Sequence, residues 1–376
     1  MTGEISMVDN PLTDRPTDRQ TDRQRLSSLT GIRGIACLFI VVFHYFCVFY
    51  GADASKISYS EVIRNLFQYS QYCVELFFML SGFLMAYNYK EKIQEYGIIE
   101  FVKKKIESLI LPLIIANVWS LINNILVQVL VQKTTQITVN IWNLLISIVP
   151  IHNGWIESQK IIGLPTNGTM WFIDVLILCY IIYYIIGRFT RSNDLYMIWC
   201  LIMTCLGYAC ITYNWEMPFL YYEDGRGYAP FFFGTLLYEI YSRTKEKIGR
   251  SLAIGLLIFS ICGLIIRICV GLENAYGDFY KYFIFVLCPT FIMSALYVEP
   301  IKRWLSMKAF IYLGTISMGV YFVHDALFRS INLLNTLGGN CIEFRNIIWL
   351  PAFLLVAVVG GMTLNMILKT RVLNDN

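Results

Sequence analysis

Residues 31–50 read GIRGIACLFIVVFHYFCVFY, and this stretch decides the fold. A helix of about 20 predominantly apolar residues is long enough to cross the hydrocarbon core of a bilayer. The run contains no acidic residue, no lysine and no proline. It therefore predicts a membrane-spanning helix, in which Arg33 and His44 are the two basic side chains.

The composition of the whole chain supports the same class. Of the 376 residues, 57% are apolar and 15% are charged, whereas soluble domains carry roughly 25% charged residues. So few charges cannot cover a soluble domain of this length, and bilayer must therefore replace water around most of its surface. The net charge of +4 is spread over short loops and predicts no nucleic-acid partner.

Apolar runs of similar length recur along the chain. They predict an all-α, polytopic membrane helical bundle of about ten transmembrane helices. The expected spans are residues 31–50, 67–88, 107–131, 170–187, 196–213, 227–242, 251–271, 281–298, 310–332 and 347–367. Lysines and arginines follow every second span, so the positive-inside rule predicts that both termini are cytoplasmic.

The first residues differ sharply from the rest of the chain. Residues 13–15, 17–19 and 21–23 each read Thr-Asp-Arg. A polar, charge-balanced repeat without an apolar period cannot bury enough surface to offset its ordering entropy. We therefore expect a disordered cytoplasmic tail over residues 1–27 and one membrane domain over residues 28–370.

The two basic residues of the first span share one helix face. Ionisable side chains inside a bilayer cost at least a few kcal/mol and mark functional sites. The spacing of eleven residues returns Arg33 and His44 to within about 20° of one direction, ~16 Å apart along the axis. Arg33 is expected at the cytoplasmic mouth and His44 near mid-membrane. One face thus joins an anion-binding group to a titratable base.

Other predicted spans also carry ionisable residues. His324 and Glu75 are expected at about the depth of His44, and Asp174 nearer the outer face. Two roles explain each of these three side chains equally well. The side chain either lines a polar cavity or makes a structural hydrogen bond to a neighbouring helix. Arg226 is expected near the outer interface, where it either snorkels to water or contributes to substrate binding.

Four stretches form a recognisable set of motifs. They read LTGIRGIA and VVFHY at 29–36 and 41–45, VELFFMLSGF at 74–83, MWFID at 170–174, and LGTISMGVYFVH at 313–324. Together they resemble the acyltransferase-3 family of integral membrane acyltransferases. The first stretch, with an arginine and a histidine separated by ten residues, is the most specific. The resemblance covers about residues 27 to 367, and the expected ten spans agree with it.

The resemblance implies transfer of an acyl group, usually acetyl from cytoplasmic acetyl-CoA, to a hydroxyl of a cell-surface polysaccharide, a lipid-linked sugar or a similar acceptor. We expect a multi-pass protein of the bacterial inner membrane, with acyl-CoA as co-substrate and no tightly bound cofactor. The scattered cysteines show no paired metal-ligand spacing, so no metal site is expected. The sequence departs from many family members by having Asp174 in place of a glutamate, and lysines at 103–105 in place of arginines.

By this resemblance, Arg33 and His44 take the place of the family's functional pair. Neutral His44 is expected to act as general base, because imidazole titrates near neutral pH. Arg33 is expected to bind the CoA phosphates, and a covalent acyl-enzyme on His44 or Ser81 is left open. The remaining expected site residues are Lys103, Lys104 and Lys105 for the CoA phosphates, Ser81 for the thioester or for helix packing, and Glu75 and His324 for orienting His44 or stabilising charge.

A multi-span transporter or flippase of lipid-linked glycans is the alternative from another class. Such proteins also have many spans and buried charges. They often contain internal repeats and paired helices broken by Gly or Pro, and the sequence shows no repeat of that kind. The sequence therefore favours an acyltransferase.

Overall fold

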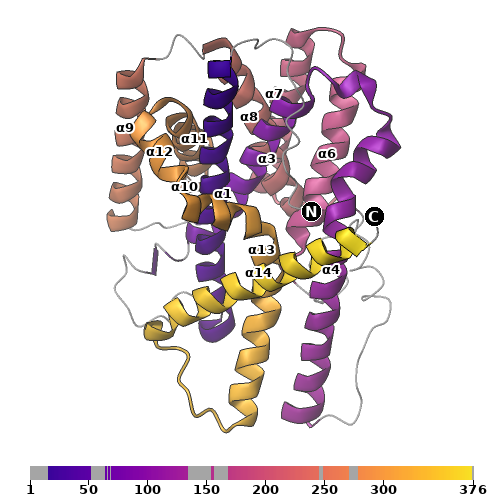
Figure 1. Ribbon diagram of the computed structural model, residues 1–376, viewed down its shortest axis with the longest axis vertical. Helices are drawn as coiled ribbons and strands as arrows, with labels where there is room; N and C mark the ends of the chain where they lie inside the picture. The colour runs from indigo at the N-terminus through magenta and orange to yellow at the C-terminus, as the bar shows by residue number, and fades with distance from the viewer. Residues whose placement is uncertain are drawn as a thin grey trace.

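The computed structural model describes residues 16–51, 64, 65, 67, 69–133, 154, 155, 168–244, 249–270 and 278–374. All regular secondary structure in these residues is helical, as the sequence predicted. The helices are α1 (Pro16–Tyr50), α3 (Cys73–Tyr89), α4 (Ile98–Leu126), α6 (Trp171–Phe189), α7 (Asn193–Tyr213), α8 (Tyr222–Thr244), α9 (Arg250–Val270), α10 (Asp278–Tyr282), α11 (Cys288–Tyr297), α12 (Glu299–Leu305), α13 (Lys308–Leu337) and α14 (Leu350–Asn374). Most of them run along the long axis of the molecule, whereas α14 lies across it (Figure 1).

Each predicted span coincides with helical structure, but seven of the described helices are long and apolar enough to cross a membrane. The others fall short for different reasons. Helix α3 has 17 residues, and α8 carries charged residues in its first and last turns. In α9 the apolar part is Arg250–Ile266. A multi-pass membrane protein is thus supported, while the count of ten spans stays a prediction.

Helix α1 begins well before the predicted membrane span. It starts at Pro16, within residues 1–27, for which a disordered tail was expected. Proline is well tolerated in the first turn of a helix, and no glycine or second proline follows before Gly31. The helix can therefore extend outward from the span without meeting a helix breaker. Residues 1–15 of the expected tail lie outside the described residues.

Helices α1 and α13 pack side by side and run in the same direction. The Cys37 thiol donates to the backbone oxygen of Ser317 at 3.3 Å, 280 residues further along the chain. Gly34 meets Gly314 at the same offset, and a Cβ on Gly34 would lie 2.7 Å from the Gly314 nitrogen. Only glycines allow two helix backbones to approach this closely. A constant offset between parallel helices predicts that residue 44 faces residue 324.

A second parallel pair is formed by α3 and α8. Arg226, in the first turn of α8, forms an ion pair with Glu75 in the first turn of α3. At the other end of the same helices, Lys90 pairs with Glu239 at 2.5 Å. The backbones touch between these two pairs, because a Cβ on Gly82 would overlap the backbone oxygen of Phe231. Helices α3 and α8 therefore begin at the same end of the bundle.

Candidate active site

His44 and His324 face each other across the interface of α1 and α13. Their ring centroids are 4.9 Å apart and their planes meet at 57°. The His324 Nδ1 atom lies 3.1 Å from the backbone oxygen of Val320. A carbonyl oxygen only accepts, so this contact assigns the hydrogen to Nδ1 and leaves Nε2 as an acceptor. The fully buried Nε2 has no hydrogen-bond partner among the described residues, so the pair offers a basic nitrogen.

The carboxylate next to His324 has its own partner. Asp325 accepts a hydrogen bond from Arg329 Nε at 2.8 Å, one turn further along α13. Asp325 also interacts electrostatically with His44. A buried carboxylate in this position stabilises positive charge that develops on a neighbouring imidazole. The spacing of four residues between Asp325 and Arg329 is the sequence signal that would have indicated the ion pair.

Arg33 lies where α1, α3 and α6 meet. Its side chain is half-buried, and its electrostatic neighbours are Tyr180 and Cys37. No carboxylate in the described part of the chain forms an ion pair with it. Tyr180 also hydrogen-bonds with the Ser81 side chain. A guanidinium beside the Tyr180 hydroxyl, without an ion pair to a described carboxylate, is well suited to bind an anion.

Lys105 extends this cluster toward the start of α4. Its Nζ atom lies 3.9 Å from the centroid of the Tyr89 ring and 5.9 Å from that of Tyr180. Tyr180 thus has Arg33 and Lys105 as its two cationic neighbours. Arg33 and Lys105 therefore form a positively charged cluster around the Tyr180 side chain.

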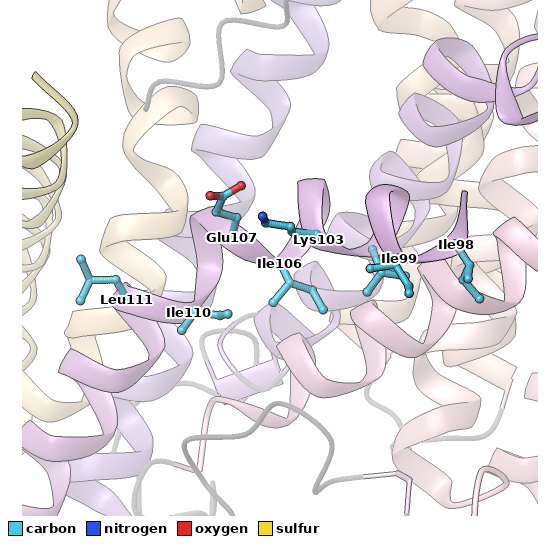
Figure 2. A pocket seen from close by; sticks show the side chains of 8 residues that line it. Ile98, Ile99, Lys103, Ile106, Glu107, Ile110 and Leu111 are labelled. Carbon is cyan, nitrogen blue, oxygen red and sulfur yellow. The ribbon is translucent and has the colours of Figure 1, made fainter. Parts of the chain in front are cut away.

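The two preceding lysines point elsewhere, because successive residues of a helix are rotated by about 100°. The Nζ atom of Lys104 lies 5.3 Å from the centroid of the Tyr96 ring. Lys103 is exposed and, together with Glu107, lines an open and mainly apolar groove along the first turns of α4 (Figure 2). Of the three lysines, the structure brings Lys105 alone close to Tyr180.

Glu75 is paired with Arg226 and not with a histidine. The Arg226 Nε atom donates to Glu75 Oε1 at 2.5 Å, and Glu75 is fully buried. The Arg226 guanidinium also lies over the Trp171 ring, 4.7 Å from its centroid. Arg226 is therefore buried against two helices, which excludes the snorkelling position considered from the sequence. Asp174, in the first turn of α6, is buried as well.

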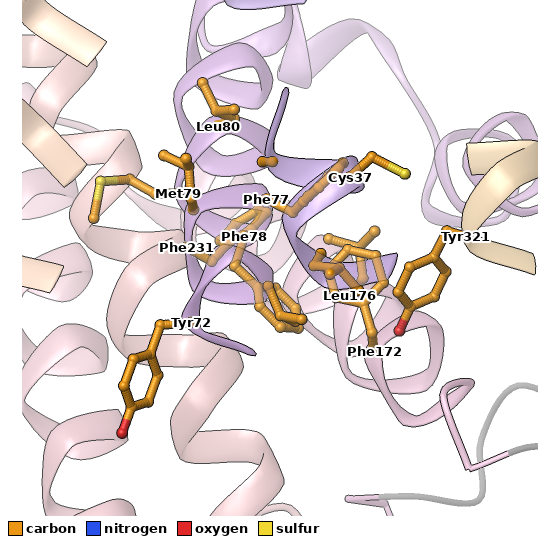
Figure 3. Close-up of a cluster of buried hydrophobic side chains, with 14 of the residues drawn as sticks. Cys37, Tyr72, Phe77, Phe78, Met79, Leu80, Phe172, Leu176, Phe231 and Tyr321 are labelled. Atoms are coloured by element: carbon orange, nitrogen blue, oxygen red, sulfur yellow. The ribbon is translucent and has the colours of Figure 1, made fainter. Parts of the chain in front are cut away.

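Tyr321 connects this ion pair with the histidines. Its ring centroid lies 5.7 Å from that of His324 and 5.4 Å from that of Phe172, the residue after Trp171. Figure 3 shows Tyr321 and Phe172 on the same side of the aromatic core. A small apolar cavity at this junction is lined by Ile40, Val74, Phe77, Phe172, Met318 and Tyr321. Four helices, α1, α3, α6 and α13, thus meet between the histidine pair and the ion pair.

Removing one charge of the buried ion pair should strongly destabilise the fold. We expect Arg226→Gln to lower the free energy of unfolding by about 3 kcal/mol, because Glu75 would keep an uncompensated buried charge. The double variant Glu75→Gln/Arg226→Gln, which removes both charges, should recover most of this loss. Thermal unfolding of the purified protein in nanodiscs measures both changes. A double variant as unstable as the single one would contradict this account.

Tyr180 carries no distinctive signal in the sequence, and neither does the pairing of Glu75 with Arg226. Tyr180 lies in an apolar span that contains several tyrosines. Arg226 and Glu75 are separated by 151 residues, and only the packing of α3 against α8 brings them together. Tyr321 did have a signal, since it precedes His324 by three residues and therefore shares its helix face.

Comparison with known proteins identifies the family of the chain. Residues 26–366 match the family described as an acyltransferase domain, the acyltransferase-3 family. No curated protein and no solved structure matches the chain. The family match confirms the resemblance seen in the four motifs and gives no support to a transporter or flippase. Because the match covers nearly the whole chain, the protein belongs to the acyltransferase-3 family of membrane acyltransferases.

Proposed function

We propose that this protein transfers an acetyl group from cytoplasmic acetyl-CoA to a hydroxyl of a cell-surface polysaccharide, a lipid-linked sugar or a similar acceptor. The protein acts in the bacterial inner membrane with both termini in the cytoplasm, as the distribution of lysines and arginines predicts. The observation that carries the proposal is the contact between His44 and His324. His44 shares its face of α1 with Arg33, which forms no ion pair with a carboxylate in the described part of the chain.

His44 is the general base in this proposal. The acceptor oxygen attacks the thioester carbonyl while His44 takes the hydroxyl proton, so that a C–O bond forms and the C–S bond breaks. The proton then passes from His44 to the departing CoA thiolate. Asp325 stabilises the transient imidazolium, and His324 orients the ring of His44 or accepts a hydrogen bond through its free Nε2.

The donor binds at the cytoplasmic end of the same helix face. Arg33 and Lys105 hold the phosphates of CoA, and the Tyr180 and Ser81 hydroxyls lie beside the path of the pantetheine arm. The axial distance of ~16 Å between residues 33 and 44 suits an extended arm that reaches from the phosphates to the thioester. Lys103 and Lys104, on other faces of α4, contribute through longer-range attraction of the anionic donor.

The test is mass spectrometry of surface glycans from cells that lack the protein. We expect the deletion to remove O-acetyl groups, wild type to restore them, and His44→Ala at equal membrane abundance not to restore them. If His44→Ala restores modification fully, His44 is not the base. If no glycan changes its acylation in any strain, the proposed reaction is wrong.

The position of Lys105 gives a second prediction. Lys105→Ala should raise the KM for acetyl-CoA by about tenfold or more, because a charge-assisted contact to a phosphate contributes roughly 1.5–3 kcal/mol. Lys103→Ala should have the smaller effect, since its side chain lines a separate groove. Steady-state kinetics at saturating acceptor measure the KM for acetyl-CoA of both purified variants. Equal effects of the two substitutions would mean that charge alone, and not position, matters.

A further inference from the structure

We propose that the first turns of α3, α6 and α8 form the binding site for the sugar of the acceptor, with Glu75, Glu223, Arg226 and Trp171 as its polar and aromatic wall. This inference rests on the proposed function, and it assigns to Glu75 a role other than orienting His44. The three helices run in parallel, so their first turns lie at one level of the bundle.

Two buried carboxylate oxygens in these first turns lack a hydrogen-bond partner among the described residues. Glu75 Oε2 is fully buried and has no hydrogen-bond partner among the described residues, although Oε1 of the same carboxylate accepts from Arg226. Glu223 lies one helical turn before Arg226 and is buried as well. Its Oε2 atom also has no hydrogen-bond partner among the described residues. A buried acceptor left unpaired costs about 1–3 kcal/mol. Both oxygens are therefore open to a ligand that brings hydrogen-bond donors.

The side chains around these oxygens have the chemistry of a sugar-binding wall. Trp171 is half-buried and Arg226, the partner of Glu75, lies over its ring, so an aromatic surface and a guanidinium border the Glu75 carboxylate. A sugar ring presents hydroxyl donors at its edge and apolar C–H groups on its face, which suits carboxylate oxygens and an indole ring in the same site. No three His, Cys, Asp or Glu side chains in the described part of the chain are grouped to hold a metal ion, which disfavours a cation as the ligand.

The first turns of α3 and α6 lie close to the histidine pair. Tyr321 packs against Phe172 on one side and His324 on the other. The first turn of α6 is thus separated from the histidine pair by one aromatic side chain and the small cavity beside it. Val74 lines this cavity together with Ile40 of α1, and Phe67 stacks on Phe46, so Glu75 lies between the levels of Arg33 and His44 along α1. A sugar held by Glu75 and Trp171 would therefore reach His44 from the side of α3 and α6.

The test measures the two substrates separately. The purified full-length protein in nanodiscs is given acetyl-CoA and unacylated surface polysaccharide isolated from the deletion strain. We expect Trp171→Ala and the double variant Glu75→Gln/Arg226→Gln to raise the KM for the polysaccharide at least tenfold, and to change the KM for acetyl-CoA less than twofold. Trp171→Phe, which keeps an aromatic ring, should stay within threefold of wild type for both substrates.

The matched control is the second ion pair between α3 and α8. Lys90→Gln/Glu239→Gln removes the same kind of pair from the other end of the same helices and should leave the KM for the polysaccharide unchanged. Equal increases in both KM values, or an equal effect of the control, would show a structural role and overturn the inference. An unchanged polysaccharide KM in the Trp171 and Glu75 variants, with His44→Ala inactive, would overturn it while the proposed function stands. Failure of wild type to acetylate the polysaccharide would instead reject the proposed function.

Discussion

Replacing His44 with alanine is expected to lower the rate of acetyl transfer by about 100- to 10,000-fold, the range that a positioned general base contributes. The ring of His44 contacts the His324 ring and interacts electrostatically with Asp325, so its loss removes the base that both neighbours support. The measurement is kcat of the purified variant with saturating acetyl-CoA and unacylated glycan. The KM for acetyl-CoA should change little, because Arg33 and Lys105 remain in place.

A double-mutant cycle with His324 tests whether the two histidines act together. His324→Ala alone is expected to reduce kcat by about tenfold or more. The variant His44→Ala/His324→Ala should then be no more than a few-fold slower than His44→Ala, since residues that act as a unit show non-additive effects. Losses that multiply would mean that His324 contributes independently of His44. An unchanged rate in His324→Ala would assign this histidine to packing.

Replacing Gly314 with valine is expected to prevent accumulation of folded protein. A Cβ at this position would overlap the backbone oxygen of Thr30, which belongs to the neighbouring helix and cannot move without separating α1 from α13. Overpacking a tight core costs typically 1–3 kcal/mol when side chains can shift, and a clash with backbone leaves no such relief. We expect less than about a tenth of the wild-type amount of folded protein in the membrane.

The matched control is the same substitution at Gly255. This residue lies in α9, is exposed, and has no atom within 4 Å of the position where a Cβ would be added. Gly255→Val should therefore reach wild-type abundance, because valine has, if anything, a higher helix propensity than glycine. Size-exclusion profiles of the solubilised proteins compare the two variants. Normal folding of Gly314→Val would contradict the close approach of α1 and α13.

Local patterns in the sequence determined the class of the protein. The length of the apolar run 31–50 requires a bilayer, and the spacing of Arg33 and His44 is a property of any helix. The motif at residues 29–45 led to the family, which the match over residues 26–366 confirms. These features depend on covalent order and helical period, so they are present before any helix meets another.

The tertiary structure alone decided which helices are neighbours. His44 and His324 are 280 residues apart, and they meet because glycines let α1 and α13 approach in parallel. The partner of Glu75 is Arg226 for the same kind of reason, since α3 and α8 touch through Gly82. Likewise, the rotation of α4 against α6 selected Lys105 and not Lys103 as the neighbour of Tyr180. Contacts of this kind arise from close packing between distant segments, which no local period encodes.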